Sequence, residues 1–418
     1  MTAAAAAGAR RRLSIVFAGF VALGLFSSTF GAVWPELRRT FHQPVSALTW
    51  IGIASTIGYS LASAASARLA RRFGLAAVLV VSAAVIAVVM LLQAVDTWWL
   101  AVPFLAMIAG AAGGAVDTSG NTYVATYHGV RAMGVLHAMF GVGAVLSPLT
   151  LSAVLQAGFS WRPVFVVAGA LFAVVGVLVL ANREGWGGGR STAATPSGER
   201  VVPTEGALAG KGVAVVADGR LAATTVAASA TPRVALGVAF FVANVAFELT
   251  IGNWGSSFLR DLRHLPKTVT QRWLAGFWAV FTLARVALGW LTARLGEWRV
   301  LDLSIASALL GAVVITFVPG GTAAGIGMLL CGAGIAALFP LHTSLTVRRV
   351  GAERAATVIG YQIAAAGVGS ALQAALLGWI SATVGLRAFG PALLAIGVAM
   401  AVVERLVRRA AIARVPSG

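Results

Sequence analysis

The sequence predicts an all-α integral membrane protein with twelve transmembrane helices, arranged as two six-helix, pseudo-symmetric halves. Apolar residues make up 59% of the 418 residues, charged residues only 11%, and the mean hydropathy is +0.90. These values lie outside the range of soluble domains. The chain also supplies about a dozen apolar runs, each close to the ~20 residues that cross a bilayer as a helix. Similarity between the two halves is the third observation.

The apolar runs fall into two groups of six, separated by a polar gap. The predicted spans are 13–34, 46–68, 75–94, 98–126, 132–156 and 161–181, then 233–258, 271–293, 299–318, 322–345, 355–380 and 388–407.

The gap between the two groups predicts a linker. Residues 182–231 are rich in Gly, Ala, Ser and Thr and show no sustained helical periodicity, apart from a weak amphipathic pattern at 212–223. Such composition is typical of a flexible segment. We therefore expect an N-terminal bundle at 1–181, a cytoplasmic linker at 182–231 and a C-terminal bundle at 232–418.

The two halves share short sequence patterns in the same order. Residues 110–118 (GAAGGAVDT) align with 332–340 (GAGIAALFP), and 67–74 (ARLARRFG) with 289–296 (GWLTARLG), both at an offset of 222. Residues 141–144 (GVGA) match 367–370 (GVGS) at an offset of 226. Repeated halves with a site at their interface are a common plan of secondary transporters.

The distribution of Lys and Arg predicts the orientation. With twelve spans both termini share a side, and placing them in the cytoplasm puts 22 of the 31 basic residues inside and 8 outside, with Arg285 inside a span. Basic loops favour the cytoplasmic side. We expect a multi-pass protein of the plasma (inner) membrane with both termini cytoplasmic; its basic exterior segment 258–271 has no explanation at this level.

Composition and missing motifs exclude several classes. The basic residues are scattered in loops, so the net charge of +18 does not indicate nucleic-acid binding. The sequence has no Walker A pattern, HExxH motif, nucleophile elbow or Cys/His cluster, so we expect no enzyme, no cofactor and no metal site. The expected partners are a small-molecule solute, protons and the lipid bilayer, and the protein is expected to act as a monomer.

Asp117 is one of two carboxylates in the middle of long apolar runs. Asn121 follows it by one turn, and Gly110 and Gly113 share its face. Ionisable residues at bilayer depth are rare and usually functional, so we interpret Asp117 as a proton-coupling residue. The alternative is a structural acid hydrogen-bonded to a neighbouring helix.

Glu248 is the second such carboxylate. It shares a face with Asn244 and Gly252, and Asn253 and Trp254 follow it. Amides bind a carboxyl or a polar solute, and an indole offers a flat surface for a ring. We expect Glu248 to take part in proton coupling and Asn244, Asn253 and Trp254 to bind solute, unless Glu248 only makes an interhelical hydrogen bond.

Four further polar residues lie within spans. Asn121, His137, Tyr361 and Gln362 are predicted to bind solute, the last two as part of a polar stripe in the eleventh span. The alternative for each is a hydrogen bond that joins two helices. Arg285 either pairs with Glu248 or extends toward the membrane surface.

Several of these segments resemble the major facilitator superfamily, and within it the fucose permease-like branch of sugar:proton symporters. They are 113–121 (GGAVDTSGN), 136–143 (LHAMFGVG), 248–254 (ELTIGNW) and 339–340 (FP). The resemblance implies the major facilitator fold, alternating access, and a proton-coupling role for the acid of the fourth helix, which is Asp117 here. The acid that this branch carries in its first helix has no counterpart; residues 26–29 read FSST.

Three functions remain open. The first is a proton-coupled secondary transporter of a small polar solute, sugar or polyol-like. The second is a proton-antiport efflux pump for amphipathic drugs or metabolites, because a cavity with two acids and many apolar side chains also suits lipophilic cations. The third is a non-transporting membrane sensor or scaffold, which has no need for buried acids in both halves.

Overall fold

The computed structural model describes residues 3–128, 130–183, 186, 232–350 and 352–412. These residues form helices without any strand, and twelve helical segments are long and apolar enough to cross a membrane, which confirms the predicted fold class. The first six spans are α1 (Ala3–Thr40), α2 (Leu48–Phe73) with the short turn η1 (Val45–Ala47) before it, α3 (Leu75–Val95), α4 (Ala101–Tyr127), α5 (Val130–Gln156) and α6 (Arg162–Ala181).

The second six spans contain nine helical elements, since three of the spans are built from two pieces. They are α8 (Pro232–Ser257) with η2 (Phe258–Leu262), α9 (Lys267–Leu295), α10 (Glu297–Phe317), α11 (Gly321–Ala336) with α12 (Leu338–Val350), α13 (Ala352–Thr383), and η3 (Leu386–Ala388) with α14 (Phe389–Ile412). The predicted amphipathic pattern at 212–223 lies outside the described residues, as does almost all of the predicted linker.

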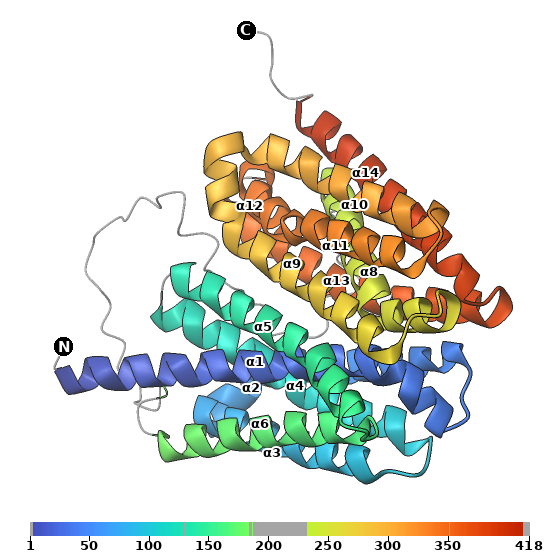
Figure 1. The fold of residues 1–418 in the computed structure, drawn as a ribbon. Helices are drawn as coiled ribbons and strands as arrows, with labels where there is room; N and C mark the ends of the chain where they lie inside the picture. The colour runs from blue at the N-terminus through green and yellow to red at the C-terminus, as the bar shows by residue number, and fades with distance from the viewer. Residues whose placement is uncertain (1–2, 129, 184–185, 187–231, 351, 413–418) are drawn as a thin grey trace, which may run out of the picture.

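Each half pairs its helices in the same way (Figure 1). In the first half α1 packs on α5, α2 on α4, and α3 on α6; in the second, α8 packs on α13, α9 on α11, and α10 on α14. Equivalent glycines make equivalent contacts, because Gly110 approaches the Ser55 carbonyl and Gly332 approaches the Phe277 carbonyl. Both partners are offset by 222 residues, as in the sequence repeat. Small residues allow such close backbone packing in lipid.

Three predicted boundaries need correction. Helix α1 continues to Thr40, beyond the predicted end at 34, and the chain between α8 and α9 is helical except for residues 263–266, so the predicted 258–271 loop is mostly helix. The predicted limits differ because hydropathy marks only the residues that are apolar enough to lie in lipid. The hydrogen-bonded helix continues beyond the end of the apolar run. The predicted span 322–345 is broken at Ala337. Pro340 lacks the N–H that would bond to the Ala336 carbonyl.

The two bundles meet at one end of the molecule and spread apart toward the N-terminus (Figure 1). We call the meeting end, where α1 finishes and η2 lies, the far end, and the facing surfaces of the two halves the seam. At the far end Gln271 and Ser256 donate to the Ala32 carbonyl. Thr49 donates to the Ala374 carbonyl, at 2.8 Å. These bonds join the halves.

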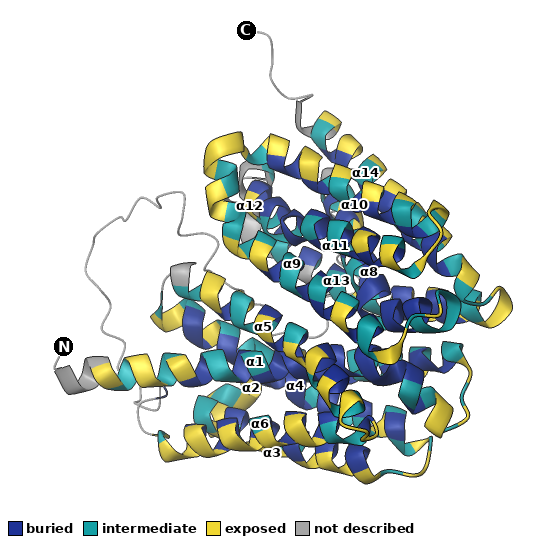
Figure 2. Cartoon of the chain, viewed as in Figure 1, coloured by how far each residue is buried: buried dark blue, intermediate teal, exposed yellow. Residues whose placement is uncertain are grey.

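Burial follows the position of each helix (Figure 2). The middle of α1 is buried, whereas the outer faces of α3 and α6 are exposed. The exposed side chains on those faces are apolar, among them Val81, Val88, Val174 and Val177. An extended apolar surface of this kind marks contact with the membrane, so the chain is a multi-pass membrane protein.

Candidate functional site

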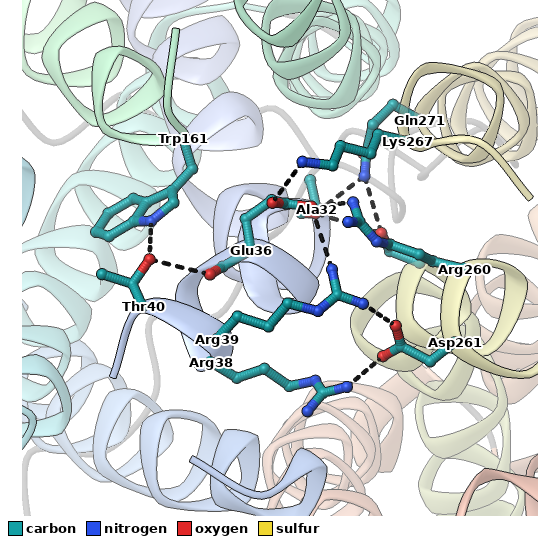
Figure 3. A network of polar contacts seen from close by, with 11 residues as sticks. Ala32, Glu36, Arg38, Arg39, Thr40, Trp161, Arg260, Asp261, Lys267 and Gln271 are labelled. Carbon is teal, nitrogen blue, oxygen red and sulfur yellow. Dashed lines mark hydrogen bonds and ion pairs between the residues drawn. The ribbon is translucent and has the colours of Figure 1, made fainter. Parts of the chain in front are cut away.

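An ion network joins the two halves at the far end (Figure 3). Glu36, near the end of α1, accepts a hydrogen bond from Arg260 of η2 and lies 3.3 Å from the Lys267 ammonium of α9. The Glu36 side chain is only 14% exposed. Because water is largely excluded there, this pairing is stronger than that of an ordinary surface ion pair.

The second carboxylate of the network is Asp261. One of its oxygens lies 2.7 Å from the Arg38 guanidinium, and the other accepts from Arg39, so two arginines of α1 hold one acid of the other half. The far-end ion network is defined as Glu36, Arg38, Arg39, Arg260, Asp261 and Lys267. Two of the basic residues of the 258–271 segment, Arg260 and Lys267, thus reach across the seam to Glu36. The network contains four cations against two carboxylates.

Farther from the far end than the ion network, α5 of the first half crosses α9 of the second. Gly141 lies directly against Thr282, and any side chain at position 141 would overlap the threonine. The Thr282 hydroxyl donates to the Trp278 carbonyl of its own helix, at 2.7 Å, so the threonine side chain is held in place. This crossing fixes how closely the halves approach in the middle of the molecule.

Asp117 is bound by two side chains. The Tyr59 hydroxyl of α2 donates to Oδ2 at 2.5 Å, and the Asn121 amide donates to Oδ1 at 3.0 Å. Asp117 lies on the strip of α4 between glycines that face α2 and glycines that face α1. The expected pairing with Asn121 is therefore present. The Tyr59 partner was not foreseen, because the contact lies between two helices far apart in sequence.

Glu248, Arg285 and His137 approach one another at the seam. Arg285 of α9 is within electrostatic range of Glu248 on α8 and of His137 on α5. Glu248 and Arg285 are half-buried, and His137 is exposed at the seam. No ion pair within 4.0 Å joins Glu248 to Arg285 in the described residues. Instead, the Arg285 Nε donates to the Ala336 carbonyl, at 3.2 Å.

The remaining predicted site residues lie on α8 and α13 of the C-terminal half. Asn244 and Trp254 are buried, Asn253 and Tyr361 are half-buried, and Gln362 is buried with its amide bonded to Thr346. Both polar atoms of the Asn244 side chain lack a hydrogen-bond partner among the described residues. Gln362 therefore has a structural partner, whereas Asn244 has an unused donor and acceptor.

One buried charge cluster was missed in the sequence. Glu404 of α14 is 1% exposed, lies 2.6 Å from the His342 ring and accepts from Arg408 at 2.7 Å. Arg408 in turn pairs with Asp302 of α10. Glu404 lies near the end of an apolar run, where an acid usually meets water. The only available signal was its i,i+4 spacing to Arg408.

Two pseudo-symmetric six-helix halves with ionisable groups at their seam define a membrane transporter. A family-level comparison agrees, since the Major Facilitator Superfamily matches residues 15–374. The chain belongs to this superfamily. The fucose permease-like branch suggested by the short motifs is a finer assignment than this match supports.

Two curated relatives cover most of the chain. One is the "Bypass of stop codon protein 6" of Saccharomyces cerevisiae, 24% identical over an alignment of 397 residues that covers 88% of this chain and 76% of the relative. The other is the "Multidrug resistance protein Stp" of Mycobacterium tuberculosis, 24% identical over 420 residues, covering 86% of this chain and 75% of the relative.

Solved structures share the fold. The nucleoside transporter NupG superposes with a TM-score of 0.71 at 15% identity, covering 96% of this chain and 98% of that one. A bacterial homologue of the human lysosomal transporter Spinster, in an inward-facing and unoccupied conformation, has a TM-score of 0.73 at 14% identity, with 99% and 98% covered. At these identities the likeness shows the architecture alone.

Proposed function

We propose that this protein is a proton-coupled secondary transporter, which moves a small polar solute of the sugar or polyol type across the plasma membrane by alternating access. The observation that carries the proposal is Asp117, a carboxyl in the middle of a span with both oxygens hydrogen-bonded, one to each of Tyr59 and Asn121. A carboxyl at this depth that gains and loses a proton changes the charge of the membrane interior, and so couples a proton gradient to movement of the halves.

Unused polar groups in the C-terminal half support a polar solute. The side-chain amides of Asn244 on α8 and Gln373 on α13 are buried, and none of their polar atoms has a partner within the described parts of the chain. Helices α8 and α13 pack together, with Gly369 against the Val242 carbonyl. A buried amide without a partner costs about 1–3 kcal/mol. Solute hydroxyl groups would satisfy these donors and acceptors.

The orientation predicted from the basic residues gives the structure a place in the transport cycle. With both termini in the cytoplasm, the far end is exterior, and the far-end ion network closes the exterior side. The structure then corresponds to the inward-facing stage. In the opposite stage the ion pairs of Glu36 and Asp261 separate and the two halves approach at the other end.

The test is solute-driven proton flux in liposomes that contain the purified protein. Asp117→Asn keeps the size of the side chain and removes its titration, so we expect flux to fall to the level of protein-free liposomes while solute binding persists. The matched control is Asp96→Asn, an acid between α3 and α4 whose Oδ1 accepts a backbone hydrogen bond from Trp98. Flux that survives Asp117→Asn unchanged would show that Asp117 does not carry the proton.

Proton-antiport efflux of amphipathic compounds is the second candidate. It is favoured by the similarity to a mycobacterial protein whose name denotes multidrug resistance. The same liposomes distinguish the two, because lipophilic cations would then drive proton movement and sugars or polyols would not. A chain that gives no flux with either class would be the sensor or scaffold.

A further inference from the structure

Arg285 is the most unusual cation of the seam. It lies within the span of α9, whereas the other basic residues in the described parts of the chain lie in loops or near span ends. An arginine at the centre of a bilayer costs at least ~2.5–3.5 kcal/mol. Such residues therefore have a compensating partner in the working protein, and the structure shows how far the chain itself supplies one.

The chain fixes the Arg285 guanidinium from one side. Its Nε donates to the Ala336 carbonyl, and the guanidinium lies over the Phe281 ring, 4.2 Å from the ring centre. The Ala336 carbonyl is available because Pro340, four residues on, has no N–H to donate to it. The break between α11 and α12 thus provides a fixed acceptor that orients the arginine.

The other side of the guanidinium is unused. An arginine has five N–H donors, and the four on the two terminal nitrogens have no hydrogen-bond partner among the described residues. Glu248 is close enough to interact electrostatically, yet it lies beyond the 4.0 Å of an ion pair. The terminal nitrogens are not among the fully buried unpaired atoms of the described residues, so the protein does not enclose them completely.

His137 of the other half faces the same place. The Gly141–Thr282 contact fixes the crossing of α5 and α9, and His137 and Arg285 each lie about one turn from it, on the side away from the far end. The His137 ring is exposed and lies within electrostatic range of the Arg285 guanidinium. A ligand held by Arg285 would therefore also contact the first half.

We infer that Arg285 binds a carboxylate group of the transported solute, which makes the substrates hydroxylated monocarboxylates, that is, acids of the sugar or polyol type. This inference rests on the proposed transport function and narrows its substrate class. A planar guanidinium whose outer donors are unused matches a carboxylate with two parallel hydrogen bonds. A neutral sugar would leave the charge of Arg285 without a counterion.

The charges around the site favour a monoanion. Arg285 has no ion pair within 4.0 Å among the described residues, and Glu248 nearby would repel a second negative charge on the solute. The far-end ion network adds an excess of cations where a solute would enter from the exterior, and a cationic entrance raises the local concentration of anions. A carboxylate bound between Arg285 and His137 would also draw the two halves together.

The experiment is equilibrium binding to the detergent-purified, full-length protein, followed by thermal shift, with acids and their neutral counterparts. The pairs are gluconate with glucitol, glucuronate with glucose, and glycerate with glycerol. We expect the wild type to bind at least one acid about tenfold or more tightly than its neutral counterpart, equivalent to ~1.4 kcal/mol. Arg285→Gln should remove this preference, and Arg285→Lys should retain part of it.

Arg263→Gln is the matched control. Arg263 is also held by a backbone carbonyl, that of Ile315, and lies over the Phe258 ring, but at the far end. Its loss should leave the acid preference intact. Equal affinity of the wild type for acids and neutral counterparts, or no binding of any acid at millimolar concentration, overturns the inference. So does an equal loss of both classes in Arg285→Gln and Arg285→Lys.

Failure here is distinguishable from failure of the proposed function. The binding measurement needs no proton gradient, whereas the proposed function is judged by proton flux and its dependence on Asp117. A neutral sugar that drives Asp117-dependent flux, with no acid preference in binding, would leave the transporter proposal standing and refute the role of Arg285.

Discussion

The buried polar residues of the C-terminal half divide into those whose side chains are hydrogen-bonded and those that have no partner among the described residues. Gln362 exchanges hydrogen bonds with Thr346 at 2.9 and 3.2 Å, so its amide supports the packing of α12 against α13. Asn244 is equally buried and has no such partner among the described residues. The two amides were given the same role in the sequence, and only the structure separates them.

Replacing each amide by leucine tests this difference. Asn244→Leu removes an unsatisfied buried amide, so we expect the protein to become more stable by about 1 kcal/mol, or to be unchanged, while solute flux falls. Gln362→Leu leaves Thr346 without its partner and should destabilise by about 1–3 kcal/mol. Thermal unfolding of the detergent-purified variants measures the first quantity and liposome flux the second. A destabilised Asn244→Leu would show that the amide already has a partner.

At the same scale, the sequence predicted some contacts and missed others for a clear reason. The bond between Asp117 and Asn121 follows from an i,i+4 spacing. Tyr59 and Glu404 could not be recognised, because their importance depends on which helix lies beside them. Local periodicity describes the faces of one helix and carries no information on its neighbours.

Helix crossings decide how the elements of the two halves meet. At the crossing of α5 and α9, a methyl group at position 141 would overlap the Thr282 side chain, so the helices must separate to accommodate it. Overpacking of this kind typically costs about 1–3 kcal/mol. The closed arrangement of the far end depends on this crossing, because the same two halves carry both contacts.

We expect Gly141→Ala to lower the melting temperature and to loosen the far end. Gly134→Ala is the control on the same helix, since nothing lies within 4 Å of a methyl group there, and alanine favours a helix over glycine by up to ~1 kcal/mol. The measurement is thermal unfolding together with labelling of Ser256→Cys, a buried far-end position. Equal stability of the two glycine variants would contradict the tight crossing.

The number and approximate limits of the helical elements were predictable, and their ends and breaks were not. Apolar runs reveal the twelve spans because a helix that crosses the bilayer must be predominantly apolar over the thickness of the hydrocarbon core. The break at Ala337 depends on Pro340, whose missing N–H was visible in the sequence. The hydrogen bond that Arg285 donates to the freed Ala336 carbonyl required the three-dimensional arrangement.

At the scale of the whole molecule, the far-end ion network holds one of two arrangements of the halves. If the far end opens, all ion pairs between the two halves break. Each of these pairs therefore stabilises the closed far end over the open one, and none of them stabilises the packing within either half. Partly buried pairs in a network stabilise more than isolated surface pairs. Removing Asp261, which two arginines contact, should shift this preference most directly.

We expect Asp261→Asn to favour opening by about 1–2 kcal/mol, which corresponds to a roughly 5–30-fold change in population. The readout is the rate at which a membrane-impermeant maleimide, added on the side of the membrane that the far end faces, labels Ser256→Cys. The single native cysteine, Cys331, is buried and contributes little background labelling. Asp96→Asn is the control acid. Unchanged labelling in Asp261→Asn would mean that the network does not stabilise closure.

The sequence by itself determined the membrane class, the twelve spans, the twofold repeat and the rare acids Asp117 and Glu248, because hydropathy, periodicity and the cost of buried charge act along the chain. The tertiary structure decided which groups meet: Tyr59 with Asp117, Arg285 with the Ala336 carbonyl, and two acids of the far end with the cations of the opposite half. These contacts join residues 51 to 231 positions apart. Their formation depends on how helices pack against one another, which no pattern within a single helix specifies.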